Sequence, residues 1–370
     1  MRPESAFLVL TGAEVQSLLA GQESETIEVV RKAYETHYRG ETSLPHSTFL
    51  RFPNDQANRI IALPAYLAGE SGGAGIKWIS SFPGNIAQGL DRASAIVILN
   101  SMETGRPTVM MEGSVVSAKR TAASAALAAR ALHTDKSVDS VGVIGCGLIN
   151  LEIQGFLLSQ FPSIKKLCVY DLKADRAAQF KLACLERFDG IRVDVACDEE
   201  SLLRAAPLIS IATTAAKPHI TDLSGLAAGA TILHISLRDL APEVILTCDN
   251  IADDIDHVCR AQTSVHLAEQ LSGTREFVRC VLAEITSGKV AARRDDESIA
   301  VFSPFGLGVL DVAVGEFVYQ RATREGKGIQ IDSFFPGAPL SALSRPTNRW
   351  SLASRQAARE SANSPLKENT

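Results

Sequence analysis

The sequence predicts an α/β protein, with a doubly wound parallel sheet and a smaller α+β domain built from the N- and C-terminal segments of the chain. Three observations support this prediction. Strand and helix patterns alternate after residue 140, shorter strand patterns precede them, and a glycine turn at residues 145–147 joins a buried strand to a helix. Repeated strand–helix units imply parallel strands joined by right-handed crossovers.

The glycine turn is the most informative segment of the chain. Val141–Ile144 has the pattern of a buried strand, and Gly-Cys-Gly leads from it into a helix. Glycines let the backbone approach a pyrophosphate, whose charge the free amides and the dipole of the following helix stabilise. The predicted cofactor contacts in this turn are Gly145, Cys146, Gly147, Leu148 and Ile149. An ordinary tight turn of an α/β protein is the alternative.

The next predicted strand, Lys166–Tyr170, ends at Asp171. An acidic residue at this place binds the ribose 2′-hydroxyl of a dinucleotide. The segment therefore predicts a Rossmann-type domain that binds NAD in preference to NADP. Asn150 stands where a third small residue is usual, so we expect the helix and the strand to pack less closely there.

Length and composition indicate a globular protein of about two domains. The chain has 370 residues, of which 46% are hydrophobic and 21% charged. A net charge of −5 gives no electrostatic reason to expect nucleic acid or an anionic membrane as a partner. We recognise no signal peptide and no long apolar span, which favours a cytoplasmic location. The seven cysteines include no Cys-x-x-Cys pair and are expected to be reduced.

Before the glycine turn, the pattern is that of a small sheet with helices. An amphipathic helix is predicted at Thr26–Tyr38, and the alanine-rich helix Val116–Leu132 leads into the turn as a hinge. The other predicted strands are Ser47–Phe52, Arg59–Leu63, Ile76–Ser80, Ala95–Leu99, Ile191–Ala196, Leu208–Thr213, Thr231–Ser236 and Asn250–Ile251.

These elements predict four parts of the chain. They are a substrate-binding and dimerisation domain at 1–118, an NAD-binding domain at 119–305, a returning segment at 306–343 and a disordered tail at 344–370. The segment Gly306–Arg324 is helical in pattern, and its apolar stripe needs a partner face, so we expect it to cross back to the first domain. The tail is polar and has little apolar content.

Two cations stand in mostly apolar surroundings. Lys77 is the only charged residue between Ser71 and Leu90, and an alternating strand would partly desolvate it, which suits anion binding or proton transfer. Arg120 shares its helix face with small residues, so its guanidinium can reach a substrate carboxylate or a phosphate. A lysine at a sheet edge and a structural ion pair are the alternatives. Lys119 is expected to be solvated.

Asp239 follows a predicted parallel strand, so it lies at the carboxyl end of the sheet, where α/β folds bind ligands. A carboxylate there can exchange protons with an amine or a water. The adjacent Arg238 can neutralise it or bind a second acidic group. The cluster Asp253, Asp254, Asp256 and His257 resembles a set of metal ligands, but capping of a helix start explains it better, and we predict no metal site.

Several segments resemble the ornithine cyclodeaminase and μ-crystallin family. They are Gly-Ile-Lys-Trp-Ile-Ser-Ser-Phe-Pro-Gly-Asn (75–85), Ser-Ala-Lys-Arg-Thr-Ala-Ala-Ser-Ala-Ala-Leu-Ala-Ala (117–129), the glycine turn, Ala-Thr-Thr (212–214) and Ser-Pro-Phe-Gly-Leu-Gly (303–308). Ser-Ser-Phe-Pro-Gly-Asn (80–85) and Ser-Leu-Arg-Asp-Leu-Ala-Pro-Glu (236–243) look most like the branch that makes 2,3-diaminopropionate for siderophores and peptide antibiotics.

The resemblance implies a homodimeric enzyme that uses NAD to oxidise N-(2-amino-2-carboxyethyl)-L-glutamate, a small amino-acid substrate, and releases 2,3-diaminopropionate and 2-oxoglutarate. It implies that Lys77 and Arg120 bind the substrate carboxylate near the nicotinamide and that Asp239 is the acid/base, so Lys77 and Asp239 are the candidate catalytic residues. The further cofactor contacts that it implies are Arg120, Ser94, Thr213 and Ser236.

Two departures from the cyclodeaminase pattern argue against ornithine as substrate. Ser47 stands where cyclodeaminases usually have an arginine, and Leu237 and Arg238 replace a glycine pair before Asp239. An added cation suits a substrate with several carboxylates, and the candidate substrate contacts are Lys77, Arg120, Arg238 and Ser47. The alternatives are ornithine cyclodeamination or imine reduction, and a catalytically silent, crystallin-like nucleotide-binding protein.

Overall fold

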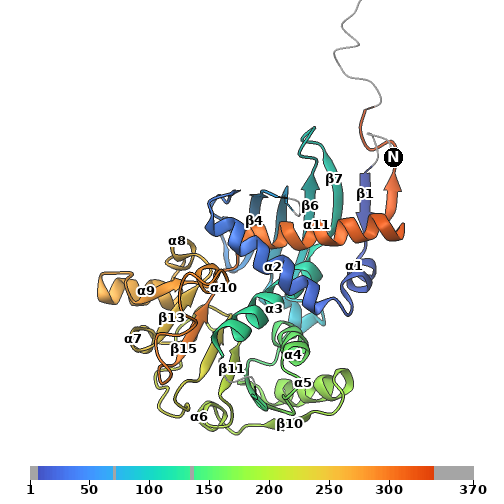
Figure 1. Ribbon diagram of the computed structural model, residues 1–370. Coiled ribbons are helices and arrows are strands. Elements are labelled where there is room, and N and C mark those ends of the chain that lie inside the picture. Colours follow the sequence, from blue (N-terminus) through green and yellow to red (C-terminus); the bar gives the residue numbers. More distant parts are fainter. Residues whose placement is uncertain (1–6, 70–71, 134–136, 337–370) are drawn as a thin grey trace, which may run out of the picture. The chain divides into compact units, whose positions relative to one another are not determined.

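The computed structural model describes residues 7–69, 72–133 and 137–336 (Figure 1). By compactness the chain divides into a body, Leu8–Ile329, and a small unit made of its two ends. In the small unit the rings of Phe7 and Phe334 stack, with their centroids 4.1 Å apart. The tail predicted at 344–370 lies outside the described residues. Everything below concerns the body.

The first sheet comes from the N-terminal part of the chain and is mainly antiparallel. Its strands in the body are β1 (Phe7–Leu10), β2 (Thr42–Ser43), β3 (Thr48–Phe52), β4 (Asp55–Leu67), β5 (Gly73–Ser81), β6 (Ala93–Asn100) and β7 (Pro107–Glu112). They lie in the order β1-β7-β6-β5-β4-β2, with β3 also paired to β4 and β1 parallel to β7. The last described strand of the chain is β16 (Ile329–Ile331).

One face of this sheet is covered by helices. The helices of this part are α1 (Gly12–Leu19), α2 (Glu23–Tyr38), the 3₁₀ turn η1 (Pro83–Gln88) and α11 (Gly308–Glu325). In Figure 1, α11 runs across the strands, and it packs against β4, β5, β6 and α2. The C-terminal helix α11 thus lies against the first sheet. Along β5, Lys77 is buried on the covered face, whereas Trp78 is 40% exposed on the other.

The second sheet is wholly parallel, and the predicted doubly wound fold is confirmed. Its strands are β8 (Ser140–Ile144), β9 (Lys166–Tyr170), β10 (Arg192–Val195), β11 (Leu208–Ile211), β12 (Thr231–His234), β13 (Asp249–Ala252), β14 (Val278–Val281) and β15 (Ala300–Ser303). They lie in the order β10-β9-β8-β11-β12-β15-β13-β14. Strands β14 and β15 are not among the predicted strands, and β15 is inserted between β12 and β13.

The helices of the second sheet are α4 (Leu148–Gln160), α5 (Ala174–Arg187), α6 (Glu199–Leu203), α7 (Pro242–Thr247), α8 (Ile255–Val258), α9 (Ser264–Ser272) and α10 (Leu282–Thr286). Among the described residues, no helix is long and apolar enough to cross a membrane. All seven cysteines are free thiols, and only Cys197 is exposed. The domain boundaries at 118/119 and 305/306 stay predictions.

Helix α3 (Gly113–Leu132) joins the two halves of the body, because it packs against β5 and β6 of the first sheet and against β12 and β15 of the second. Its alanines are almost all buried, which lets neighbouring elements approach closely. The expectation that Lys119 is solvated is wrong. Lys119 is buried, and its ammonium lies 2.8 Å from Glu152 of α4, because α3 is enclosed on that side as well.

Candidate active site

The turn between β8 and α4 requires glycine. Gly145 has a φ of +91°, and a Cβ atom there would lie 2.4 Å from the carbonyl oxygen of Ala212. Gly147 precedes α4, and no side chain caps the first amides of this helix. Leu148, in the first turn, is 57% exposed. A close backbone approach next to an uncapped helix start is what a dinucleotide pyrophosphate needs, so the turn fits a cofactor of this class.

Asn150 binds the turn through its side-chain amide. Its side chain is fully buried and donates hydrogen bonds to the carbonyls of Ile144 (2.9 Å) and Gly145 (2.7 Å). Ser210 of β11 donates to its amide oxygen at 2.6 Å. The amide therefore fastens the start of α4 to the end of β8 and to β11, and the expected looser packing of helix and strand stays a prediction.

Asp171 reaches the glycine turn from the end of β9. Its carboxylate accepts hydrogen bonds from the amides of Cys146 (2.8 Å) and Lys173 (3.0 Å). Arg176 of α5 lies 3.7 Å from the same carboxylate and donates to the carbonyl of Cys146 at 3.3 Å. The structure thus brings the predicted ribose-binding residue together with the predicted pyrophosphate-binding turn.

Asp239 is fully buried beyond the carboxyl end of β12, and three predicted site residues meet there. The hydroxyls of Thr213 and Ser236 both donate to its carboxylate. Two histidines that the sequence analysis did not single out complete the surroundings: Nε2 of His219 lies 3.2 Å from Oδ1, and Nε2 of His234 lies 3.3 Å from Oδ2.

These contacts keep Asp239 ionised. Burial alone would raise the pKa of its carboxyl group, but hydrogen bonds from His219 and Ser236, together with the nearby His234, outweigh burial and hold that pKa far below its usual range. Nε2 of His234 also accepts a hydrogen bond from the amide of Asp239, at 3.2 Å. His219 also lies 3.1 Å from Glu199, and its side chain is 35% exposed. Asp239 and Glu199 together raise the pKa of His219 to about 10. The buried carboxylate therefore has a protonated, half-exposed partner.

Lys77, Arg120 and Asp311 form a second buried group, which we call the Lys77 cluster. The ammonium of Lys77 lies 2.7 Å from Oδ2 of Asp311, and Nε of Arg120 lies 3.1 Å from Oδ1. Lys77 also donates to the hydroxyl of Ser117 at 3.1 Å. Burial lowers the pKa of Lys77, and the charge of Asp311 opposes that shift. Two positive charges share one negative charge, so the group is suited to hold one more carboxylate.

The turn before α11 is shaped around Arg120. Gly306 has a φ of +92°, and a Cβ atom there would lie 3.0 Å from Nη1 of Arg120. The amides of Phe305 and Gly306 each donate to Asp253 at 2.8 Å, and burial raises the pKa of that carboxyl group. The turn is therefore bound to Asp253 on one side and lies against Arg120 on the other.

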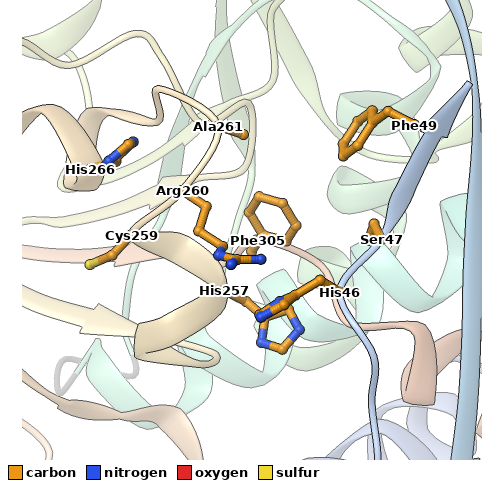
Figure 2. A pocket seen from close by; sticks show the side chains of 9 residues that line it. All are labelled: His46, Ser47, Phe49, His257, Cys259, Arg260, Ala261, His266 and Phe305. Carbon is orange, nitrogen blue, oxygen red and sulfur yellow. The ribbon is translucent and has the colours of Figure 1, made fainter. Parts of the chain in front are cut away.

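A pocket of about 510 Å³ opens beside this turn. Figure 2 shows Phe49 of β3 and Ser47, just before β3, at one side, and His257, Cys259, Arg260, Ala261 and His266 at the other. The residues that line it are His46, Ser47, Phe49, His257, Cys259, Arg260, Ala261, His266 and Phe305. Ser47, a predicted substrate contact, therefore lines this pocket, whereas Lys77, Arg120 and Asp311 do not. Phe305 is the sequence neighbour of Gly306, which lies next to Arg120.

Two predicted site residues lie elsewhere than expected. Arg238 does not neutralise Asp239, because its guanidinium donates to the carbonyls of Ala261 (2.5 Å) and Gln262 (3.0 Å), while histidines occupy the carboxylate. Ser94 bonds to Ser80, with 2.9 Å between the hydroxyl oxygens, on the sheet face opposite Lys77. The structure therefore does not bring Ser94 together with Lys77 or with the glycine turn.

The acidic segment at 253–257 has a structural role. Asp254 caps α8 by accepting the amide hydrogen of His257 at 2.8 Å, and its other oxygen lies 2.9 Å from Nε2 of His37. In the described part of the chain, no group of three or more His, Cys, Asp or Glu side chains could hold a metal ion.

Comparison with known proteins identifies the family. A family model described as the ornithine cyclodeaminase/mu-crystallin family matches residues 6–326. The chain belongs to this family. It is 27% identical over 333 residues to the N-((2S)-2-amino-2-carboxyethyl)-L-glutamate dehydrogenase of Staphylococcus aureus, a match that covers 88% of the chain and 98% of that protein. With the alanine dehydrogenase of Archaeoglobus fulgidus the identity is 30%, over the same shares of the two chains.

A solved member of the family has the same fold. It is an archaeal alanine dehydrogenase dimer with bound NAD, 29% identical in sequence, and it superposes with a TM-score of 0.79. The match covers 89% of this chain and all of that one. Three residues of the candidate site are not among those predicted from sequence: Asp311, His219 and His234. Of these three, only Asp311 has a sequence pattern that could have indicated it, because it is the one charged residue in the apolar run from Val301 to Gly315.

Asp171→Ala should weaken NAD binding about tenfold, because hydrogen bonds to a charged acceptor are each worth about 1.5–3 kcal/mol. The ratio of NAD affinity to NADP affinity should also fall, because Arg176 would no longer face Asp171 and could bind the 2′-phosphate of NADP. Fluorescence titration with both cofactors measures this. The control is Asp175→Ala, the same charge change at an exposed position of α5. An unchanged ratio of the two affinities would remove Asp171 from cofactor selection.

Proposed function

We propose that the protein is an NAD-dependent dehydrogenase of a secondary amine. Its substrate would be N-((2S)-2-amino-2-carboxyethyl)-L-glutamate, and its products 2,3-diaminopropionate and 2-oxoglutarate. The observation that carries the proposal is the Lys77 cluster, in which Lys77 and Arg120 share a single buried carboxylate and can bind the α-carboxylate of an amino acid. The dehydrogenase from Staphylococcus aureus supports the substrate.

NAD fits the glycine turn and Asp171, and when bound it supplies the hydride acceptor for oxidation of the glutamyl carbon–nitrogen bond. Lys77 and Arg120 orient the α-carboxylate next to that bond. Asp239, held ionised by its two histidines, accepts a proton from the substrate amine or from the attacking water. The water oxygen becomes the keto oxygen of 2-oxoglutarate, the carbon–nitrogen bond breaks, and the amine leaves as 2,3-diaminopropionate. One proton is released per turnover.

Two alternatives make different predictions. A cyclodeaminase would convert ornithine to proline and ammonia with only catalytic NAD, but Ser47, Leu237 and Arg238 depart from the cyclodeaminase pattern. A silent crystallin-like protein would bind the nucleotide without turnover. The joint presence of Lys77, Arg120 and the ionised Asp239 speaks against the silent protein.

The deciding experiment is a turnover assay with purified protein and NAD. With the glutamate conjugate we expect stoichiometric release of NADH and 2-oxoglutarate, and with ornithine no proline. Proline and ammonia from ornithine without net NADH would make the protein a cyclodeaminase. Binding of NAD without oxidation of either amine would make it silent.

We also propose a cytoplasmic homodimer. The face of the first sheet opposite α11 exposes large apolar side chains, with Leu50 47% and Trp78 40% accessible. An exposed apolar face of this kind is typical of a protein–protein interface. The solved archaeal alanine dehydrogenase is a dimer.

A further inference from the structure

We propose that Arg51, Arg59, Arg92 and Arg238, here called the arginine group, bind a second carboxylate of the substrate. This inference rests on the proposed function, in which the Lys77 cluster holds the first carboxylate. It restricts the substrate to compounds with at least two carboxylates and excludes alanine and ornithine.

Strand register and one hydrogen bond place Arg51, Arg59 and Arg92 on the same face of the first sheet as Lys77. Arg51 of β3 lies opposite Arg59 of β4, and Arg59 lies opposite Ser81 of β5. Arg92, just before β6, donates to the hydroxyl of Ser81 at 3.0 Å. Lys77 and Ser81 are four residues apart on β5, so their side chains share one face, about 13 Å apart along the strand. Because lysine and arginine side chains are long, side chains from both ends of this distance can contact one bound molecule.

Two of these arginines flank the pocket from facing walls. The guanidinium of Arg51 lies 5.4 Å from the ring centre of Phe49, a lining residue on β3. That of Arg238 is bonded to the carbonyl of Ala261, which lines the other side. Figure 2 shows Phe49 and Ala261 on separate segments across the pocket. A ligand there would meet positive charge from both halves of the body.

None of the four arginines forms a salt bridge among the described residues, whereas Arg31, Arg187 and Arg279 each contact a carboxylate. Nε of Arg59 is buried and has no hydrogen-bond partner in the described chain.

Burial lowers the pKa of Arg59, and the charges of Arg238, Arg92 and Arg51 lower it further. The pKa values of Arg92 and Arg238 are also lowered, mainly by burial. Packing like charges together without a counterion is unfavourable. An incoming carboxylate relieves this cost, and the guanidinium fork matches its geometry.

The test is Arg59→Gln, assayed by calorimetric titration of the NADH-loaded protein with 2-oxoglutarate, which has two carboxylates, and with pyruvate, which has one. We expect at least about tenfold weaker binding of 2-oxoglutarate, the range of a lost charge-assisted hydrogen bond, and unchanged binding of pyruvate. The melting temperature should stay the same or rise, because a repulsion is removed. Arg204→Gln, at an exposed arginine beyond α6, is the control.

The inference would be overturned if Arg59→Gln bound 2-oxoglutarate as the wild type does, or if the wild type did not bind 2-oxoglutarate. It would also be overturned if the variant bound NADH more weakly, because the arginine group would then bind the cofactor phosphates. Failure here is distinguishable from failure of the proposed function. If the conjugate is oxidised but Arg59→Gln binds 2-oxoglutarate normally, only the inference falls. If the conjugate is not oxidised but 2-oxoglutarate binding depends on Arg59, only the proposed reaction falls.

Discussion

The Asp239→Asn protein should turn over at least about a hundredfold more slowly than the wild type, with nearly unchanged NAD affinity. General acid–base catalysis contributes about 10² to 10⁴ in rate, and asparagine cannot accept the proton. The carboxylate is fully buried, so no bulk water replaces its function. Steady-state kinetics at saturating NAD, cofactor titration and thermal unfolding on the one variant measure the three quantities. Near-normal turnover would remove Asp239 from the mechanism.

If Asp239 were only structural, its replacement would lower stability and would lower turnover only as a consequence. The variant His219→Asn, which removes a partner of Asp239, separates the two roles. The pKa of His219 is raised to about 10, against about 6.5 in an unfolded chain, so its ion pair contributes stability in full below pH 6.5 and loses that contribution as the pH rises to 10. His219→Asn should lack this decline and should retain more turnover than Asp239→Asn. If Asp239→Asn and His219→Asn lost the same amount of melting temperature and the same amount of turnover, the Asp239 site would be structural.

The parts of the fold that sequence predicts are those specified locally. The glycine turn, the strand before it and Asp171 lie within about 30 residues of one another, and each has a pattern with its own physical reason. Strands β4 to β6 were also visible in short alternating segments. By contrast, β15 lies between β12 and β13 although β13 and β14 precede it in the chain. No local pattern encodes that insertion.

The candidate site could be predicted only in part, because its charges are matched by residues distant in sequence. Arg120 and Asp311 are 191 residues apart. Lys77 and Arg120 are predictable because Lys77 is the single charged residue of an apolar segment and Arg120 shares its helix face with small residues. Their shared partner Asp311 is not predicted, because it lies in a helix whose apolar stripe has the pattern of a core. Arg238 was expected to meet its neighbour Asp239, but adjacent residues on a turn point apart, and the guanidinium reaches the 261–262 loop instead.

Asp311→Asn and Lys77→Met should separate the stability of the Lys77 cluster from its function. Asp311→Asn leaves two buried cations without a counterion, and breaking a buried pair in this way costs about 3–5 kcal/mol. Lys77→Met leaves a neutral pair, Arg120 with Asp311, so the fold should keep near-normal stability. It removes the charge that would bind the substrate carboxylate, and kcat/KM should fall about a hundredfold or more. Urea unfolding and steady-state kinetics on both variants measure this.

The pH dependence of Asp311→Asn gives an independent check. Burial already lowers the pKa of folded Lys77, and loss of Asp311 removes the charge that opposes this shift. Between the lowered pKa and the unfolded value of about 10.4, the unfolded chain binds more protons, so the free energy of unfolding of Asp311→Asn should rise with pH there. Adding Lys77→Met to Asp311→Asn should abolish that rise and recover part of the lost stability. If Asp311→Asn unfolds like the wild type at every pH, the two cations do not depend on Asp311, and the assignment of the Lys77 cluster as a carboxylate site loses its electrostatic basis.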